Sequence, residues 1–130
     1  MNEEINQLES YWGCVLNNSY TKQSSNILAV ILPGEGYTND KPLMYYSYKI
    51  ALELGLDVLC IDYGFQISHT NFNFDTEFDI VSKESLVVLR KVLENNYKKI
   101  IFIEKSLETI IQNELSKELM ALKYMKNFNR

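Results

Sequence analysis

The chain has 130 residues, of which 46% are hydrophobic and 23% are charged, and its formal net charge is −4. This size and composition are typical of one globular domain with its own core, so we treat residues 1–130 as a single domain. An acidic chain without a basic face is a poor partner for nucleic acid or an anionic membrane, and we expect neither. No apolar run approaches the roughly 18 residues of a membrane-spanning helix, and the acidic start of the chain is unlike a signal peptide. We therefore expect a cytoplasmic protein.

The two cysteines, Cys14 and Cys60, form neither a CxxC pair nor a spacing that is typical of a metal site. Cys60 lies within an apolar strand pattern. We expect two reduced, buried thiols, no metal and no cofactor.

Weak alternation of apolar and polar residues predicts a strand at about 11–17, paired with another at about 4–8. Polar residues gather in Asn17-Asn18-Ser19 and in Lys22-Gln23-Ser24-Ser25-Asn26, which is typical of loops. A continuous apolar run then covers Ile27–Leu32 and stops at Pro33-Gly34. A short run of this kind predicts a strand that is buried on both faces, as in a parallel sheet.

The loop Pro33–Thr38 leads into a predicted helix that Asn39 or Asp40 can cap, with Pro42 in its first turn. This helix ends at Gly55, a favoured C-terminal residue. One face of it is marked by apolar residues at helical spacing, namely Leu43, Tyr46, Ile50 and Leu54.

The second half of the chain continues the alternation of strands and helices. Leu56–Tyr63 predicts a strand, 64–78 a surface loop, and 79–96 a helix. Lys99–Glu104 predicts a further strand, and a helix follows Ser106. This order predicts a three-layer α/β fold with a mainly parallel sheet. In such sheets ligands bind at the carboxyl ends of strands, where the loops at 33–38 and 104–108 both lie.

Two segments resemble an α/β-hydrolase of the serine esterase type. Ile31-Leu32-Pro33-Gly34-Glu35-Gly36-Tyr37-Thr38 is similar to the family's His-Gly-x-Gly loop, with proline in place of histidine. Ile103-Glu104-Lys105-Ser106-Leu107-Glu108-Thr109 is similar to its nucleophile elbow, Gly-Lys-Ser-Leu-Gly-Thr, with both glycines replaced. The element order matches the first five strands of that fold, so the resemblance implies a domain that is truncated relative to the family.

The resemblance also implies roles for particular residues. Ser106 would stand at the nucleophile position, and the backbone N–H groups of Leu107 and Glu35 would form the oxyanion hole. A small-molecule ester would be the substrate. The family places its acid and its histidine after the nucleophile, but no histidine and no aspartate follow Ser106 in this chain. The only histidine, His69, precedes Ser106.

The expected function is therefore a carboxylesterase-type, serine-hydrolase-like domain that is incomplete or inactive. The alternative is a non-catalytic remnant or interaction module with the same half fold. A third hypothesis is a small-molecule binding domain that uses the loop Gly34–Thr38.

Each candidate residue also has a purely structural interpretation. Ser106 can be a helix N-cap, and Glu104 and Glu108 can be solvated charges that favour the helix dipole. His69 can be a solvated loop histidine. The strand at 99–104 would expose an unpaired apolar edge if no later strand covers it, so we expect a homo-oligomer through this edge.

Overall fold

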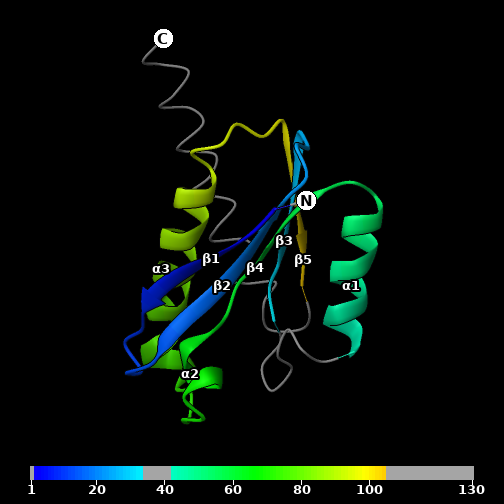
Figure 1. Cartoon of the computed structure of the whole chain (residues 1–130). Coiled ribbons are helices and arrows are strands. Elements are labelled where there is room, and N and C mark those ends of the chain that lie inside the picture. Colours follow the sequence, from blue (N-terminus) through cyan, green and yellow to red (C-terminus); the bar gives the residue numbers. More distant parts are fainter. Residues whose placement is uncertain (1, 34–41, 105–130) are drawn as a thin grey trace.

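The computed structural model describes residues 2–33 and 42–104. Five strands form one sheet in the order β1-β2-β4-β3-β5 (Figure 1). Their bounds are β1 Asn2–Glu9, β2 Val15–Lys22, β3 Ile27–Ile31, β4 Asp57–Cys60 and β5 Lys99–Ile103. The helices are α1 Pro42–Glu53, α2 Gly64–Ile67 and α3 Phe74–Val92.

The sheet is mixed because one strand runs against the others. β3 pairs in parallel with β4 and with β5, whereas β2 is antiparallel to both of its neighbours, β1 and β4. Four strands therefore share one direction. β3 lies between β4 and β5, and its residues Leu28–Ile31 have no solvent exposure. This confirms the prediction of a strand that is buried on both faces.

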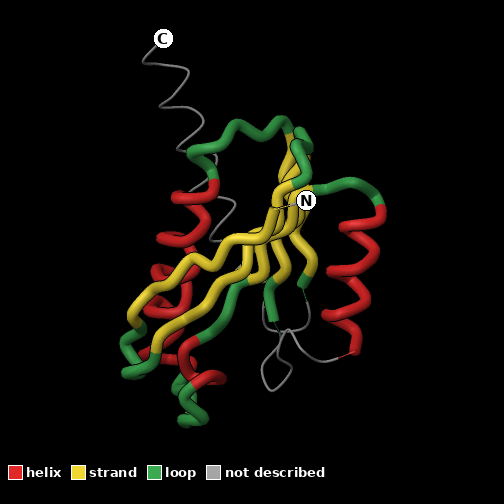
Figure 2. The backbone as a smooth tube through the Cα atoms, in the orientation of Figure 1, coloured by secondary structure: helices red, strands yellow, loops and turns green. Residues whose placement is uncertain are grey.

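Helices cover both faces of the sheet and complete three layers (Figure 2). On one face, α1 packs through Met44 and Ala51 against Ala29, Ile31 and Val58. On the other face, α2 and α3 cover a larger core that includes Leu28, Val30, Leu59, Val88 and Leu89. This confirms the predicted three-layer α/β class. None of the helices that the structure describes is long and apolar enough to span a membrane.

The N-terminal hairpin corrects the predicted strand boundaries. Residues 10–14 form the turn, and β2 extends to Lys22 through residues that were predicted as loop. Side chains alternate along β2, so that Leu16, Asn18 and Tyr20 are buried. The amide of Asn18 is satisfied by backbone groups, which explains how a polar residue occupies a core position of a strand.

Helix α1 ends as predicted, since Gly55 follows it with φ +79°. The face that was marked by apolar spacing does not pack on the sheet, however. Tyr46, Ile50 and Leu54 are 64%, 55% and 70% exposed, whereas Met44 and Ala51 are 2% exposed. Both faces of this helix are apolar, so spacing alone does not distinguish them. The predicted caps Asn39 and Asp40 lie outside the described residues.

The prediction of a surface loop over 64–78 is wrong at both ends. Helix α2 begins at Gly64, and α3 begins at Phe74. Asn73 caps α3, because its side chain accepts hydrogen bonds from the N–H groups of Asp75 and Thr76. Phe72, in the segment between the two helices, stacks on Phe65 of α2 with ring centroids 4.3 Å apart. This aromatic contact fixes a segment that has no helical or strand periodicity.

Candidate functional site

The two segments that resemble hydrolase loops leave the sheet side by side. The Leu32 N–H donates a hydrogen bond of 2.9 Å to the carbonyl oxygen of Ile103. Leu32 follows β3 and Ile103 ends β5, so the chain enters residues 34–38 and residues 104–108 from adjacent positions. The predicted site residues themselves, Ser106, Leu107 and Glu35, lie outside the described residues.

The side chain of Glu104 is less exposed than the solvated charge that was expected at this position. This side chain is half-buried, and its Oε2 atom is buried. Gly34, Gly36 and Glu108 lie outside the described residues. Glu104 stands two residues before Ser106 in the sequence, and at a working nucleophile elbow a negative charge there would oppose the formation of an oxyanion.

At the same end of the sheet, Asn18 fixes the direction of the chain after β4. Its side chain is fully buried, and its Oδ1 accepts a hydrogen bond of 2.8 Å from the Asp62 N–H. Its Nδ2 donates to the carbonyl oxygen of Asn6 at 3.2 Å. Asn18 therefore ties β1, β2 and the loop after β4 together. This role could not be predicted, since Asn18 stands in a polar run that is typical of a loop.

His69 lies in the turn after α2 and is exposed. Its backbone has φ +56°, in the left-handed region that non-glycine residues seldom adopt. Its exposure agrees with the interpretation of a solvated loop histidine.

Cys60 and Asp62 line a hollow of about 360 Å³ on the α1 side of the sheet. The other lining residues are Glu3, Asn17, Ser19, Tyr45 and Tyr48. Burial, and beyond it the charges of Asp62 and Glu3, raise the pKa of Cys60 to about 11. The thiol is therefore protonated at neutral pH and is a poor nucleophile. Both cysteines are free, as predicted, although each is half-buried rather than fully buried.

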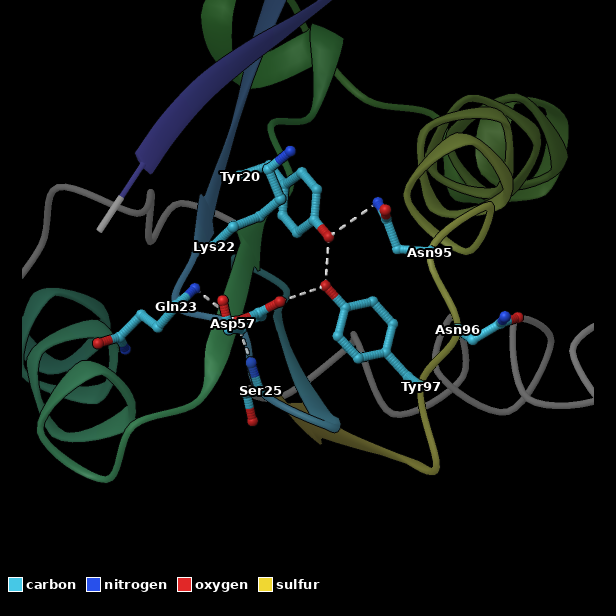
Figure 3. A pocket seen from close by; sticks show the side chains of 9 residues that line it. Tyr20, Lys22, Gln23, Ser25, Asp57, Asn95, Asn96 and Tyr97 are labelled. Atoms are coloured by element: carbon cyan, nitrogen blue, oxygen red, sulfur yellow. Dashed lines mark hydrogen bonds between the residues drawn. The ribbon is translucent and has the colours of Figure 1, made fainter.

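A second polar site lies at the opposite end of the sheet, around the first residue of β4 (Figure 3). Asp57 is 4% exposed, and its carboxylate accepts three hydrogen bonds. They come from the N–H of Gln23 at 2.7 Å, the N–H of Ser25 at 3.1 Å and the hydroxyl of Tyr97 at 2.5 Å. An open hollow of about 640 Å³ adjoins this cluster.

The side chains around Asp57 form a chain of hydrogen bonds in which donation runs from Asn95 towards Asp57. Asn95 Nδ2 donates to Tyr20 Oη at 3.2 Å, Tyr20 bonds to Tyr97, and Tyr97 donates to Asp57. Burial raises the pKa of both tyrosines, and the hydrogen bond to Asp57 raises that of Tyr97 further. Both phenols are therefore neutral donors at physiological pH.

The Asp57 cluster is better suited to holding the fold than to chemistry. It joins the connection between β2 and β3, the start of β4 and the segment before β5, which are distant in sequence. The nearest cation on its rim, Lys22, is paired with Glu4 at 2.7 Å. This cluster was not predicted. An aspartate at the start of an apolar strand was the available signal, because such a residue needs donors when it is buried.

Comparisons with known proteins agree with the fold. No protein-family model matches the chain, and no curated protein matches its sequence. The structure is similar to a crystal structure described as "Putative hydrolase" from Agrobacterium vitis S4, with a TM-score of 0.72 and 17% sequence identity. The match covers 93% of this chain and 47% of that one, so the chain spans about half the length of this neighbour. At this identity the likeness concerns the fold alone, and the chain has a hydrolase-like α/β fold.

Proposed function

We propose that the chain is a serine-hydrolase-like domain of the carboxylesterase type that is incomplete as a catalyst. One observation carries this proposal: the Leu32–Ile103 hydrogen bond starts both site loops from adjacent strand ends. An oxyanion hole needs N–H groups from two separate segments that converge on one oxygen atom. Because the two loops start next to each other, the N–H groups of Glu35 and Leu107 can converge on one oxygen atom.

In this proposal the Ser106 hydroxyl attacks the carbonyl carbon of a small-molecule ester. The carbonyl oxygen becomes an oxyanion that the two N–H groups stabilise, and the alcohol then takes up a proton and leaves this tetrahedral intermediate, which becomes an acyl-enzyme. A base must accept the proton of the serine, which is a weak nucleophile at its own pKa. The chain carries one histidine, His69, and neither a histidine nor an aspartate follows Ser106. We therefore expect that a bond to Ser106 forms slowly and that turnover does not follow.

The alternative, a non-catalytic interaction module with the same half fold, is favoured by Glu104. Its carboxylate has a buried oxygen next to the elbow, where the family has glycine. If this charge occupies the place of the oxyanion, the fold is retained without any reactivity at Ser106.

Labelling with a fluorophosphonate probe tests the proposal. We expect slow labelling that Ser106→Ala abolishes and that Ser24→Gly preserves. Ser24 is an exposed serine with φ +61°, where glycine fits without strain, so this variant is a matched control. We expect no continuous hydrolysis of a short-chain aryl ester. Labelling that does not depend on Ser106 would support the non-catalytic module, and rapid turnover would show that the catalyst is complete.

A further inference from the structure

We propose that two copies of this chain pair edge to edge through β5, antiparallel, about a two-fold axis at Ile101. The sheet order places β5 at one end. Among the residues that the structure describes, β5 pairs with β3 alone. Three features of β5 select a second copy and a single register: the direction of its backbone groups, the faces of its side chains and its charges.

The backbone groups of β5 alternate between β3 and the open edge. The carbonyl oxygen of Ile103 accepts a hydrogen bond from Leu32, the residue after β3. Because successive residues of a strand direct their N–H and C=O groups to opposite sides, Ile101 also faces β3. The N–H and C=O groups of Ile100 and Phe102 then point to the open edge. These two residues can extend the sheet.

A two-fold axis through the sheet allows few registers. Residues that lie opposite each other must share a face, and the bonded residues must both point outward. Ile100 opposite Phe102 of the second copy meets both conditions. The symmetry repeats this pair, so both outward-facing residues of each copy are hydrogen-bonded. Ile101 then lies opposite Ile101 of the second copy, on the axis, as a non-hydrogen-bonded pair.

The side chains suit this register. Ile100 and Phe102 pack towards the core on the α3 side, and all residues from Ile100 to Ile103 are half-buried. The pairing sets an aromatic residue opposite a β-branched one, a favourable cross-strand pair, and removes apolar surface from water.

The charges of the strand select the antiparallel direction. Lys98 and Lys99 stand at the start of the strand and Glu104 follows its end, with apolar residues between them. Antiparallel pairing brings the lysines of one copy towards the glutamate of the other. A parallel arrangement would place like charges together, which is unfavourable.

Opposite charges at the axis give the sharpest test. We expect that the molar mass of the unsubstituted protein, measured by light scattering over a dilution series, approaches that of two chains at high concentration. Ile101→Lys and Ile101→Glu should each remain monomeric, because identical charges meet on the axis. An equal mixture of the two should recover the twofold mass. Ile101→Thr, a β-branched residue without charge, is the matched control and should associate.

Three results would overturn this proposal. They are a monomeric mass of the unsubstituted protein at every concentration, unchanged association of the lysine variant, and no recovery in the mixture. Circular dichroism establishes that each variant is folded.

A cysteine variant keeps the proposal testable if the charged variants do not fold. Non-hydrogen-bonded antiparallel residues lie about 4.5 Å apart between Cα atoms, within the range of a disulfide. We expect Ile101→Cys to form a covalent dimer under mild oxidation. Val87→Cys, at an exposed position of α3, should not exceed the background that Cys14 and Cys60 set. Equal dimer yields for both variants would contradict the register.

Discussion

At the scale of single residues, the buried carboxylate of Asp57 shows most clearly how this sequence holds its fold. A buried charge is costly unless donors surround it, and here two backbone N–H groups and one phenol do so. The donors come from segments up to 40 residues away. The cluster therefore forms only when the β2–β3 connection, the start of β4 and the segment before β5 have come together.

Tyr97→Phe tests this cluster. The substitution removes one donor from Asp57 and one partner from Tyr20, and we expect the free energy of unfolding to fall by about 1–3 kcal/mol. Urea titration followed by circular dichroism measures the change. Tyr45→Phe, at a half-exposed tyrosine of α1, should change stability by less than about 0.5 kcal/mol. Equal effects of the two substitutions would show that the Asp57 network contributes nothing.

Alkaline pH should weaken the fold through three groups whose pKa is raised. Cys60 has a pKa of about 11 in the folded protein, against an ordinary value of 9.0, so the pH range of its effect is the best defined. The pKa values of Tyr20 and Tyr97 also lie above their ordinary 10.0. Below these ordinary values both states are protonated and the stabilisation is complete. Above them the unfolded chain loses protons first, so stability falls.

We therefore expect the urea midpoint to decline from about pH 9 upward, with a shallower decline in Cys60→Ala. At pH 8, Cys60 should react with iodoacetamide far more slowly than a free thiol. A constant midpoint between pH 8 and the folded pKa of Cys60, about 11, would contradict the assignment.

At the scale of elements, α1 shows what periodicity can and cannot predict. Its place and its end at Gly55 were predictable, because an apolar pattern and a glycine stop are local signals. Its buried face was not. Apolar residues occupy two faces, and the face that packs on the sheet is the one with Ala51, whose small side chain allows close approach.

Two alanine substitutions in α1 test this orientation. Met44→Ala should lower the free energy of unfolding by about 2–5 kcal/mol, because Met44 fills the core between α1 and the sheet. Ile50→Ala should change it by less than about 0.5 kcal/mol, since Ile50 is 55% exposed. Chemical denaturation compares the two variants. A larger loss for Ile50→Ala would mean that the other face packs on the sheet.

The contact between α2 and the β1–β2 turn depends on the absence of a side chain at Gly64. A Cβ atom there would collide with Ser10 Oγ and lie 2.7 Å from Trp12 Cε3. We expect Gly64→Ala to destabilise the protein by about 1–3 kcal/mol and to change the fluorescence of Trp12, the only tryptophan. An unchanged thermal midpoint and emission spectrum would show that the turn does not pack on α2.

At the scale of the whole molecule, the α/β class and the element order were predictable because parallel strands are continuous apolar runs. The reversal of β2 was not, because the sequence of a strand does not encode its direction relative to its neighbours. The helix α2 was not either, because its four residues are too few to show a helical period. Asn18 and Asp57 escaped prediction because their partners are distant in sequence. For the predicted site, the described residues show that the two loops begin at neighbouring strand ends. The roles of Ser106, Leu107 and Glu35 stay predictions.

The central claim, that Ser106 stands at the nucleophile position of a hydrolase-like half fold, has one direct measurement. It is the rate at which a fluorophosphonate modifies Ser106 in the double variant Glu104→Gly/Glu108→Gly. This variant has glycine at the two positions where the family's nucleophile elbow has glycine. Mass spectrometry of the labelled peptide locates the adduct. We predict that the adduct forms on Ser106 faster than in the unsubstituted protein, since no glutamate then stands two residues before or after Ser106 in the sequence. An adduct on another residue, or none on Ser106 in either protein, would contradict the account.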